Sequence, residues 1–185
     1  IMAKGDGQIT LDIPPTNDIT MNGLYVIDNG LYNFTLKSLF IQRSFKLIHG
    51  STISFNGPFS ETTLKVDAVY ATKARLYDLL SESDRPSVVG DELKDARTPQ
   101  LINVNLHMNG YLNNPRLTFD LDLEDKHSQS TLAYQRLKII NNDDQKKVNQ
   151  VASLLVINSF VPPDGIGGNT ALSGAVNNIS QIVSS

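Results

Sequence analysis

The chain has no cysteine among its 185 residues, little charge, and no long apolar run. The absence of cysteine excludes disulfides, thiolate zinc sites and cysteine nucleophiles. Charged residues make up only 19% of the chain and the net charge is −3, so the basic surface that nucleic acid requires is missing. The longest apolar run, at residues 154–157, is far shorter than the ~20 residues of a membrane-spanning helix.

The length and the apolar content are sufficient for a buried core. Hydrophobic residues form 40% of the chain, which fits one domain or one elongated segment. The sequence begins at Ile1 without a charged and then apolar leader, so we expect a piece of a longer protein.

Alternation of apolar and polar residues dominates the first two-thirds of the chain and predicts β-strands. Residues 63–71, 102–108 and 117–123 each place apolar side chains on one face and polar ones on the other. Eight strands at roughly ten-residue spacing are expected, with Asn29-Gly30 as a turn between two of them. Such a pattern is typical of a meander, a barrel, a sandwich or an elongated sheet with one apolar and one wet face.

The pattern changes towards the C-terminus. Residues 81–99 are charged and bounded by prolines, which predicts a surface excursion. Helices are expected at residues 130–140 and from the cap Asn142-Asp143-Asp144 to the stop at Pro162-Pro163. A last amphipathic helix places Leu172, Val176, Ile179 and Val183 on one stripe. We therefore expect a sheet segment at 1–125 and a helical part at 126–185.

Neither the histidines nor the glycine-rich loop forms a site by sequence. His49, His107 and His127 have no HExxH or other paired spacing, so ordinary strand-face and surface histidines are favoured over metal ligands. The loop at residues 165–168 lacks the Lys-Ser/Thr that follows the glycines of a nucleotide-binding loop, which favours a flexible connector. No metal and no cofactor is expected.

The most acidic cluster is Asp120, Asp122, Glu124 and Asp125. On a strand, Asp120 and Asp122 share the face opposite Phe119, and two carboxylates on one face can serve acid–base chemistry. A solvated outer face is the simpler interpretation, and the oxygen pattern of an EF-hand calcium loop is missing. No catalytic residue is expected.

Three ordered motifs resemble the C-terminal domain of the translocation and assembly module subunit TamB family, a group of AsmA-like bridge-type lipid transfer proteins. Gly30-Leu-Tyr-Asn-Phe34 resembles the family's Gly-x-Tyr-x-Phe strand. Gly50-Ser-Thr-Ile-Ser-Phe-Asn-Gly57, followed by Leu64-Lys-Val-Asp-Ala-Val-Tyr70, resembles its next strands. Asn149-Gln-Val151 with Ser153-Leu-Leu-Val-Ile-Asn-Ser-Phe160 resembles its Gln-x-x-Ser-Leu-Leu helix.

The resemblance implies a fold and a set of lining residues. The fold is mainly β, a curled open (taco-like) elongated sheet with an apolar interior, capped by C-terminal helices. The implied lining of a groove for phospholipid acyl chains, with inward orientation taken from the alternation, consists of Phe34, Leu36, Phe45, Leu47, Ile53, Phe55, Leu64, Val66, Tyr70, Val104, Leu106, Leu117, Phe119 and Leu121.

The resemblance also implies a task without catalysis. Family members are periplasmic, anchored in the inner membrane, and meet an outer-membrane Omp85-type barrel, TamA or a relative. One hypothesis is therefore a lipid conduit between the two membranes of a Gram-negative cell. A second is a chaperone-like module that holds outer-membrane strands by β-augmentation. A third, a carbohydrate-acting enzyme, would need Asp120 and Asp122 in a cleft, and Asn substitutions there are expected to cause no loss.

Overall fold

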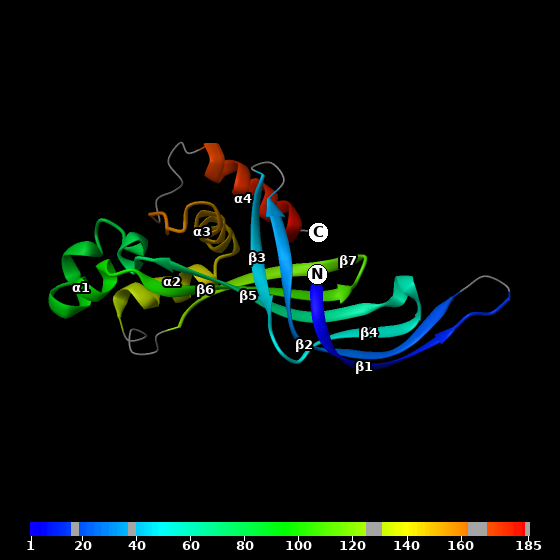
Figure 1. Ribbon diagram of the computed structural model, residues 1–185. Helices are drawn as coiled ribbons and strands as arrows, with labels where there is room; N and C mark the ends of the chain where they lie inside the picture. Colours follow the sequence, from blue (N-terminus) through cyan, green and yellow to red (C-terminus); the bar gives the residue numbers. More distant parts are fainter. Residues whose placement is uncertain (16–18, 37–39, 125–130, 163–169, 184–185) are drawn as a thin grey trace.

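The computed structural model describes residues 1–15, 19–36, 40–124, 131–162 and 170–183 as one antiparallel sheet with helices at its C-terminal end (Figure 1). The strands are β1 (Met2–Asp12), β2 (Thr20–Leu36), β3 (Ile41–Leu47), β4 (Ser51–Pro58), β5 (Thr63–Ala74), β6 (Gln100–Tyr111) and β7 (Asn114–Leu123). The α-helices are α1 (Gly90–Arg97), α2 (Leu132–Asn141), α3 (Asp144–Ile157) and α4 (Thr170–Val183). Short 3-10 turns lie at Phe59–Glu61, Leu76–Leu79 and Arg85–Ser87. This mainly β arrangement with C-terminal helices confirms the predicted fold class.

The sheet runs in the order β1-β2-β3-β5-β6-β7, and β4 pairs with β2 and β5. β3 and β4 therefore lie end to end, and together they fill the place between β2 and β5. β3 pairs with residues 31–36 of β2, whereas β4 pairs with residues 20–27. β3 and the end of β2 rise towards α4, while the β1–β2 ribbon extends away from the helices (Figure 1). The sheet is curled by this divergence.

The predicted turn at Asn29-Gly30 is wrong, because these residues lie inside the continuous strand β2. Asn29 pairs with Lys4 and Gly30 with Ala3 of β1, and the irregularity is absorbed as a bulge between Lys4 and Gly5. Pairing with β1 keeps the chain extended where the local sequence favours a turn, and β3 and β4 pair with β2 on the opposite side just after and just before these residues. The strands expected before and after Asn29-Gly30 form the single strand β2. The described residues therefore contain seven strands instead of the eight expected.

The segment 81–99, expected as a surface excursion, is mostly exposed or half-buried and contacts the rest of the fold at a few points. Val88 and Ala96 are buried, and Glu92 of α1 accepts a hydrogen bond from the Leu132 amide at 2.8 Å. Arg136 of α2 forms an ion pair with Asp84, with Nη2 2.5 Å from Oδ1. The charged residues therefore fasten the segment to α2, although the same composition is typical of a solvated loop.

The helix boundaries follow local chemistry. Asp143 caps α3 and accepts from the Lys146 amide at 3.0 Å, as predicted. The predicted stop at Pro162-Pro163 is wrong, because α3 ends at Ile157 and Asn158 adopts a left-handed conformation with φ of 52°. An Asn in this conformation is a common way to end a helix.

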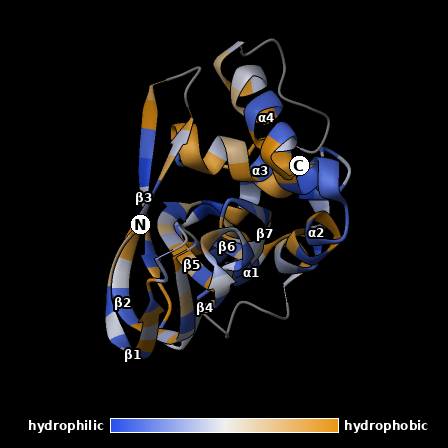
Figure 2. Ribbon diagram, turned by 90° about the vertical axis from the view of Figure 1, so that its right-hand side faces the viewer, coloured by the Kyte–Doolittle hydropathy of each residue, from blue (hydrophilic) through white to orange (hydrophobic). Residues whose placement is uncertain are grey.

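One hydrophobic cluster joins the sheet and the helices. It includes residues from β2 to β7 together with residues of α2, α3 and α4. Apolar and polar residues alternate along the strands (Figure 2), and in α4 Leu172, Val176 and Ile179 of the predicted stripe are buried. The expected division at residue 125 falls outside the described residues.

Candidate functional site: an apolar sheet face

The fourteen residues expected to line a groove lie on one face of the sheet. Residues directly opposite each other in neighbouring strands share a face. Leu47 lies opposite Ala68, Ile53 lies opposite Leu64, and the same counting continues through β5, β6 and β7. We call this side of the sheet the inner face.

Helices cover one end of the inner face. Eleven of the fourteen residues are buried, and only Ile53, Phe55 and Tyr70 are half-buried. α2, α3 and α4 contact β7, and α4 also contacts β2. In this arrangement most of the expected lining forms a packed core with the helices.

Four aromatic rings form the centre of the covered end. The Phe45 ring lies 5.9 Å from Phe34, 5.7 Å from Tyr70 and 6.5 Å from Phe119, measured between centroids. Phe34 and Phe119 meet edge to face at 5.8 Å. Edge-to-face and tilted geometries are the favourable ones for aromatic pairs, so this is an ordered core.

Polar contacts hold the end of α3 on the inner face. Arg43, which the alternation places among the apolar residues of β3, donates from Nε to the Leu155 carbonyl at 2.7 Å. Tyr70 and Thr72 of β5 each donate a hydroxyl hydrogen bond of 3.1 Å to Asn158 Oδ1. Arg43 thus satisfies one of the carbonyls left without a partner at the helix end, and the two hydroxyls hold the side chain of Asn158, the residue that follows α3.

The Gln-x-x-Ser motif of α3 fastens the chain that follows the helix. Gln150 is buried, and its amide donates to the Val161 carbonyl at 2.8 Å and accepts from the Val161 amide at 3.0 Å. Ser153 Oγ donates to the Ser159 carbonyl at 2.6 Å. These bonds return the chain against α3 and bury Phe160.

Among the described residues, no helix lies over the other end of the inner face (Figure 1). Ile9 is 43% exposed and Leu11 is 53% exposed. Together with Gly5 and Gly7, they occupy every second position of β1 and lie on the inner face. Ile9 and Phe55 flank Gly23 from its two sides, since each pairs with it. We call this surface the open end; it consists of Ile9, Leu11, Met21, Tyr25, Ile53 and Phe55.

Only Ile53 and Phe55 of the open end were among the residues expected to line a groove. Ile9 and Leu11 show the same alternation in the sequence, so the signal for them was present. Met21 and Tyr25 could be assigned to this face only with the pairing register, because the bulge shifts the alternation within β2.

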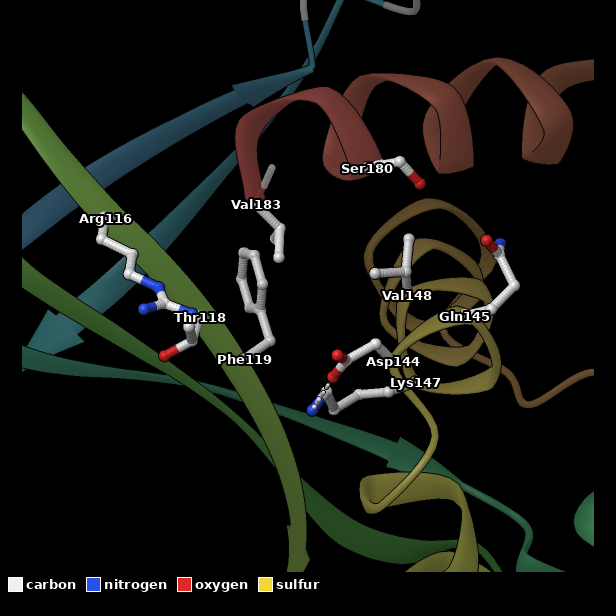
Figure 3. A pocket seen from close by; sticks show the side chains of 9 residues that line it. All are labelled: Arg116, Thr118, Phe119, Asp144, Gln145, Lys147, Val148, Ser180 and Val183. Atoms are coloured by element: carbon white, nitrogen blue, oxygen red, sulfur yellow. Dashed lines mark hydrogen bonds and ion pairs between the residues drawn. The ribbon is translucent and has the colours of Figure 1, made fainter. Parts of the chain in front are cut away.

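A small cavity of about 290 Å³ lies between β7, α3 and α4, beside Phe119 (Figure 3). It is lined by Arg116, Thr118, Phe119, Asp144, Gln145, Lys147, Val148, Ser180 and Val183. Asp144 Oδ1 lies 2.9 Å from Lys147 Nζ, so this cation is already paired. The volume is at the low end for ligand pockets and suits one chemical group rather than an acyl chain.

Comparison with protein families shows which family the chain belongs to. The profile of the TamB C-terminal domain matches residues 1–185. The chain belongs to the TamB C-terminal domain family. A search of curated proteins and a search of solved structures each found no match.

Membership in the TamB family supports a role in outer-membrane assembly and a location in the cell envelope. Within the described part of the chain, no helix has the length and apolarity needed to span a membrane. The relationship suggested by the three motifs is thus confirmed over the whole chain.

On the outer face of this TamB domain, one histidine lies between two carboxylates. His107 of β6 lies between Asp67 of β5 and Asp120 of β7, with Nδ1–Oδ1 of 2.6 Å and Nε2–Oδ1 of 2.5 Å. Asp122 accepts from the Tyr134 hydroxyl at 3.4 Å. Among the described residues, no group of three His, Cys, Asp or Glu could hold a metal ion. His127, Asp125 and the 165–168 loop lie outside those residues.

We expect His107 to make stability depend on pH. Burial lowers the pKa of His107, but its hydrogen bonds and charge interactions with Asp120 and Asp67 outweigh this and raise it. A raised folded pKa means that the stabilisation is complete below the unfolded value of about 6.5 and is lost as pH rises through the folded pKa. The stability advantage of the parent over His107→Gln should therefore shrink between pH 6 and pH 9 in urea unfolding.

The matched control for this experiment is His49→Gln. His49 pairs with Asp28 at 3.4 Å, but its side chain is 78% exposed, and exposed pairs contribute little. We expect the stability of this variant to remain close to that of the parent. A difference between parent and His107→Gln that is constant across the pH range would contradict the role assigned to the cluster.

Proposed function

We propose that the chain is a non-enzymatic periplasmic segment of a TamB-like protein that supports outer-membrane biogenesis by guiding phospholipids along an apolar β groove between the inner and outer membranes. Family membership supports the envelope role. The observation that carries the lipid assignment is the open end, where large apolar side chains on one face are exposed or half-buried.

The physical argument is the cost of exposed apolar surface. Each methylene of an acyl chain that leaves water gains about 0.8 kcal/mol, and the same contact shields the protein side chain. Ile9, Leu11 and Phe55 lie on one face around Gly23, where no side chain blocks the approach. A one-sided apolar surface of this kind suits a flexible chain better than a shaped ligand.

The covered end sets a limit on where a lipid can go. Phe45, Val104 and Leu106 are fully buried beneath the helices, so an acyl chain contacts the open end and stops where α3 and α4 begin. The buried residues of the expected lining would meet lipid only after the helices had moved away.

The family relationship supports the wider setting of the proposal. The full-length protein would be anchored in the inner membrane and reach the outer membrane, where an Omp85-type barrel, TamA or a relative, would be its partner. The domain itself would supply a surface for transfer and no reactive group.

The experiment is lipid extraction and mass spectrometry on the purified domain. We expect phospholipid with the parent and its loss in Phe55→Glu, because a carboxylate at the open end opposes acyl-chain contact. The matched control is Leu24→Glu. Leu24 of β2 lies opposite Ser54 of β4, next to Phe55 in the sequence, and is 46% exposed, but its side chain lies on the outer face. A lipid-free parent, or equal loss in both variants, would contradict the assignment.

An alternative function is a chaperone-like scaffold for outer-membrane protein insertion, acting by β-augmentation with an Omp85-type barrel. The observation that favours it is the edge strand β1, whose eleven residues pair only with β2 among the described strands. Exposed edges of this length are templates for another strand. A lipid-free parent that binds a barrel would favour this alternative.

A further inference from the structure

The cavity beside Phe119 is lined by three segments that lie far apart in the sequence. Its volume is about 290 Å³, and its lining comes from β7, from the start of α3 and from the end of α4. In Figure 3, Arg116 and Thr118 lie on one side of the Phe119 ring. Asp144 and Lys147 lie on the other side of it. Polar groups therefore approach the same small space from two directions.

The charges that line the cavity favour an anion. Arg116 and Lys147 contribute two positive charges and Asp144 contributes one negative charge, so the lining carries a net charge of +1. The Lys147 side chain is only 16% exposed, whereas the Asp144 side chain is 92% exposed. Water screens the exposed carboxylate more strongly than the sheltered ammonium group, so the positive charge dominates inside the cavity.

Two acceptors hold the ammonium group of Lys147 at the cavity. Its Nζ donates to the Asn141 carbonyl at 3.2 Å and to Asp144 Oδ1 at 2.9 Å. An ammonium group has three N–H donors, so one of them is left for a ligand. Asn141 is itself fixed, because its side-chain amide binds both backbone groups of Leu121 in β7.

Arg116 has no carboxylate partner within the part of the chain that the structure describes. Its direct neighbour across the sheet is Asn109 of β6, and the next residue in that row is Lys65 of β5. The hydroxyls of Thr118 and Ser180 also line the cavity and form no hydrogen bond among the described residues. One guanidinium group and two hydroxyls are thus available as donors.

We propose that the cavity binds a phosphate group between Arg116 and Lys147. Thr118 and Ser180 supply the further hydroxyl donors. A phosphate presents several acceptor oxygens, and the planar fork of an arginine binds two of them at once. A carboxylate has only two oxygens, which is fewer than the donors that line this cavity.

The two kinds of wall define the ligand class. Phe119, Val148 and Val183 form an apolar side, which suits the carbon part of a phosphate ester. A phospholipid headgroup and a soluble phosphate ester share this chemistry. The site does not depend on the lipid role of the open end, because the cavity lies between β7 and the helices and shares no residue with the open end.

The first test is a titration of isotope-labelled protein with glycerol 3-phosphate at constant ionic strength, followed by NMR. We expect saturable shifts of the backbone amides of Thr118, Lys147 and Ser180. Glycerol, which lacks the phosphate, is the matched control ligand and should leave these amides unchanged. If glycerol 3-phosphate gives no saturable shift at these amides, the proposal is overturned.

Charge variants test which groups hold the phosphate. Arg116→Gln and Lys147→Gln should each weaken binding about tenfold, as expected for the loss of one charged hydrogen-bond donor. Asp144→Asn should strengthen binding about threefold, because it removes the carboxylate that competes for Lys147. A purely structural role of Asp144 would not produce such a gain, so an unchanged affinity in this variant would overturn the assignment.

The matched control variant is Lys65→Gln. Lys65 is an exposed cation in the same row of the sheet as Arg116, but it does not line the cavity. Its replacement should change the affinity less than about twofold, since solvent screens a charge at that distance. Equal weakening by Lys65→Gln and Arg116→Gln would show general charge attraction and would overturn the site.

A soluble phospholipid distinguishes the two sources of the phosphate. Dihexanoyl phosphatidylglycerol carries a phosphodiester on acyl chains that are short enough to stay dissolved. Tighter binding of this lipid than of glycerol 3-phosphate at the same amides assigns a lipid headgroup, and the reverse order assigns a soluble ester. Shifts at Ile9 and Phe55 report acyl contact at the open end separately, so either site can fail without the other. Binding of neither compound at the cavity amides would overturn the phosphate site.

Discussion

Replacing Phe45 with alanine is expected to lower the free energy of unfolding by about 3–5 kcal/mol. The Phe45 side chain is fully buried and lies within 6.5 Å of the Phe34, Tyr70 and Phe119 rings, measured between centroids. Removing the ring would leave a cavity between the sheet and the helices that neither can move to fill, and would also remove the aromatic contacts. Urea unfolding followed by circular dichroism measures the change. A domain of this size has only about 5–15 kcal/mol of stability in total, so the variant would be close to unfolding.

The matched variant is Phe55→Ala at the open end. Phe55 is half-buried and no helix covers it, so the same chemical change should cost less than half as much. The ratio of the two costs therefore reports how firmly the helices pack on the inner face. Equal costs at the two positions would contradict the distinction between a covered end and an open end.

Replacing Gln150 with leucine is expected to cost about 2–5 kcal/mol. Leucine has a similar size, but it leaves the buried amide and carbonyl of Val161 without their partners, and each unpaired buried group costs about 1–3 kcal/mol. The same change would loosen the segment that buries Phe160. Hydrogen exchange at the Val161 amide, together with urea unfolding, separates local opening from global loss.

Gln145→Leu is the control for this change. Gln145 lies on the same helix, and its hydrogen bond to Asn149 is exposed to solvent. Exposed substitutions of this kind change stability by less than about 0.5 kcal/mol. If both leucine variants had the same small effect, the Gln150 bonds to Val161 would not be holding the chain against α3.

The sequence alone predicted the inner face well where strands alternate without interruption. From β5 to β7, the apolar residues at every second position lie on one side, since cross-strand pairs such as Val104 and Leu121 share a face. The cap at Asp143 and the stripe of α4 were also predictable, because both depend on local chemistry.

The remaining features depend on contacts between distant segments. Asn29-Gly30 favours a turn locally, but β1 pairs with both residues, and β4 and β3 pair with β2 before and after them. Arg43 lies on the inner face because a carbonyl at the end of α3 accepts its hydrogen bond. Neither the sequence pattern nor the family resemblance states which part of the apolar face the helices cover.

The most direct test of the account is photo-crosslinking with a phospholipid that carries a photoreactive group in its acyl chain, followed by mass spectrometry of the labelled peptides. The account predicts adducts on β1 at Ile9 and Leu11 and on β4 at Phe55, and none on the buried Val104 and Leu106. Adducts on the outer face at Leu24, or no adducts at the open end, would contradict the claim that this surface receives acyl chains.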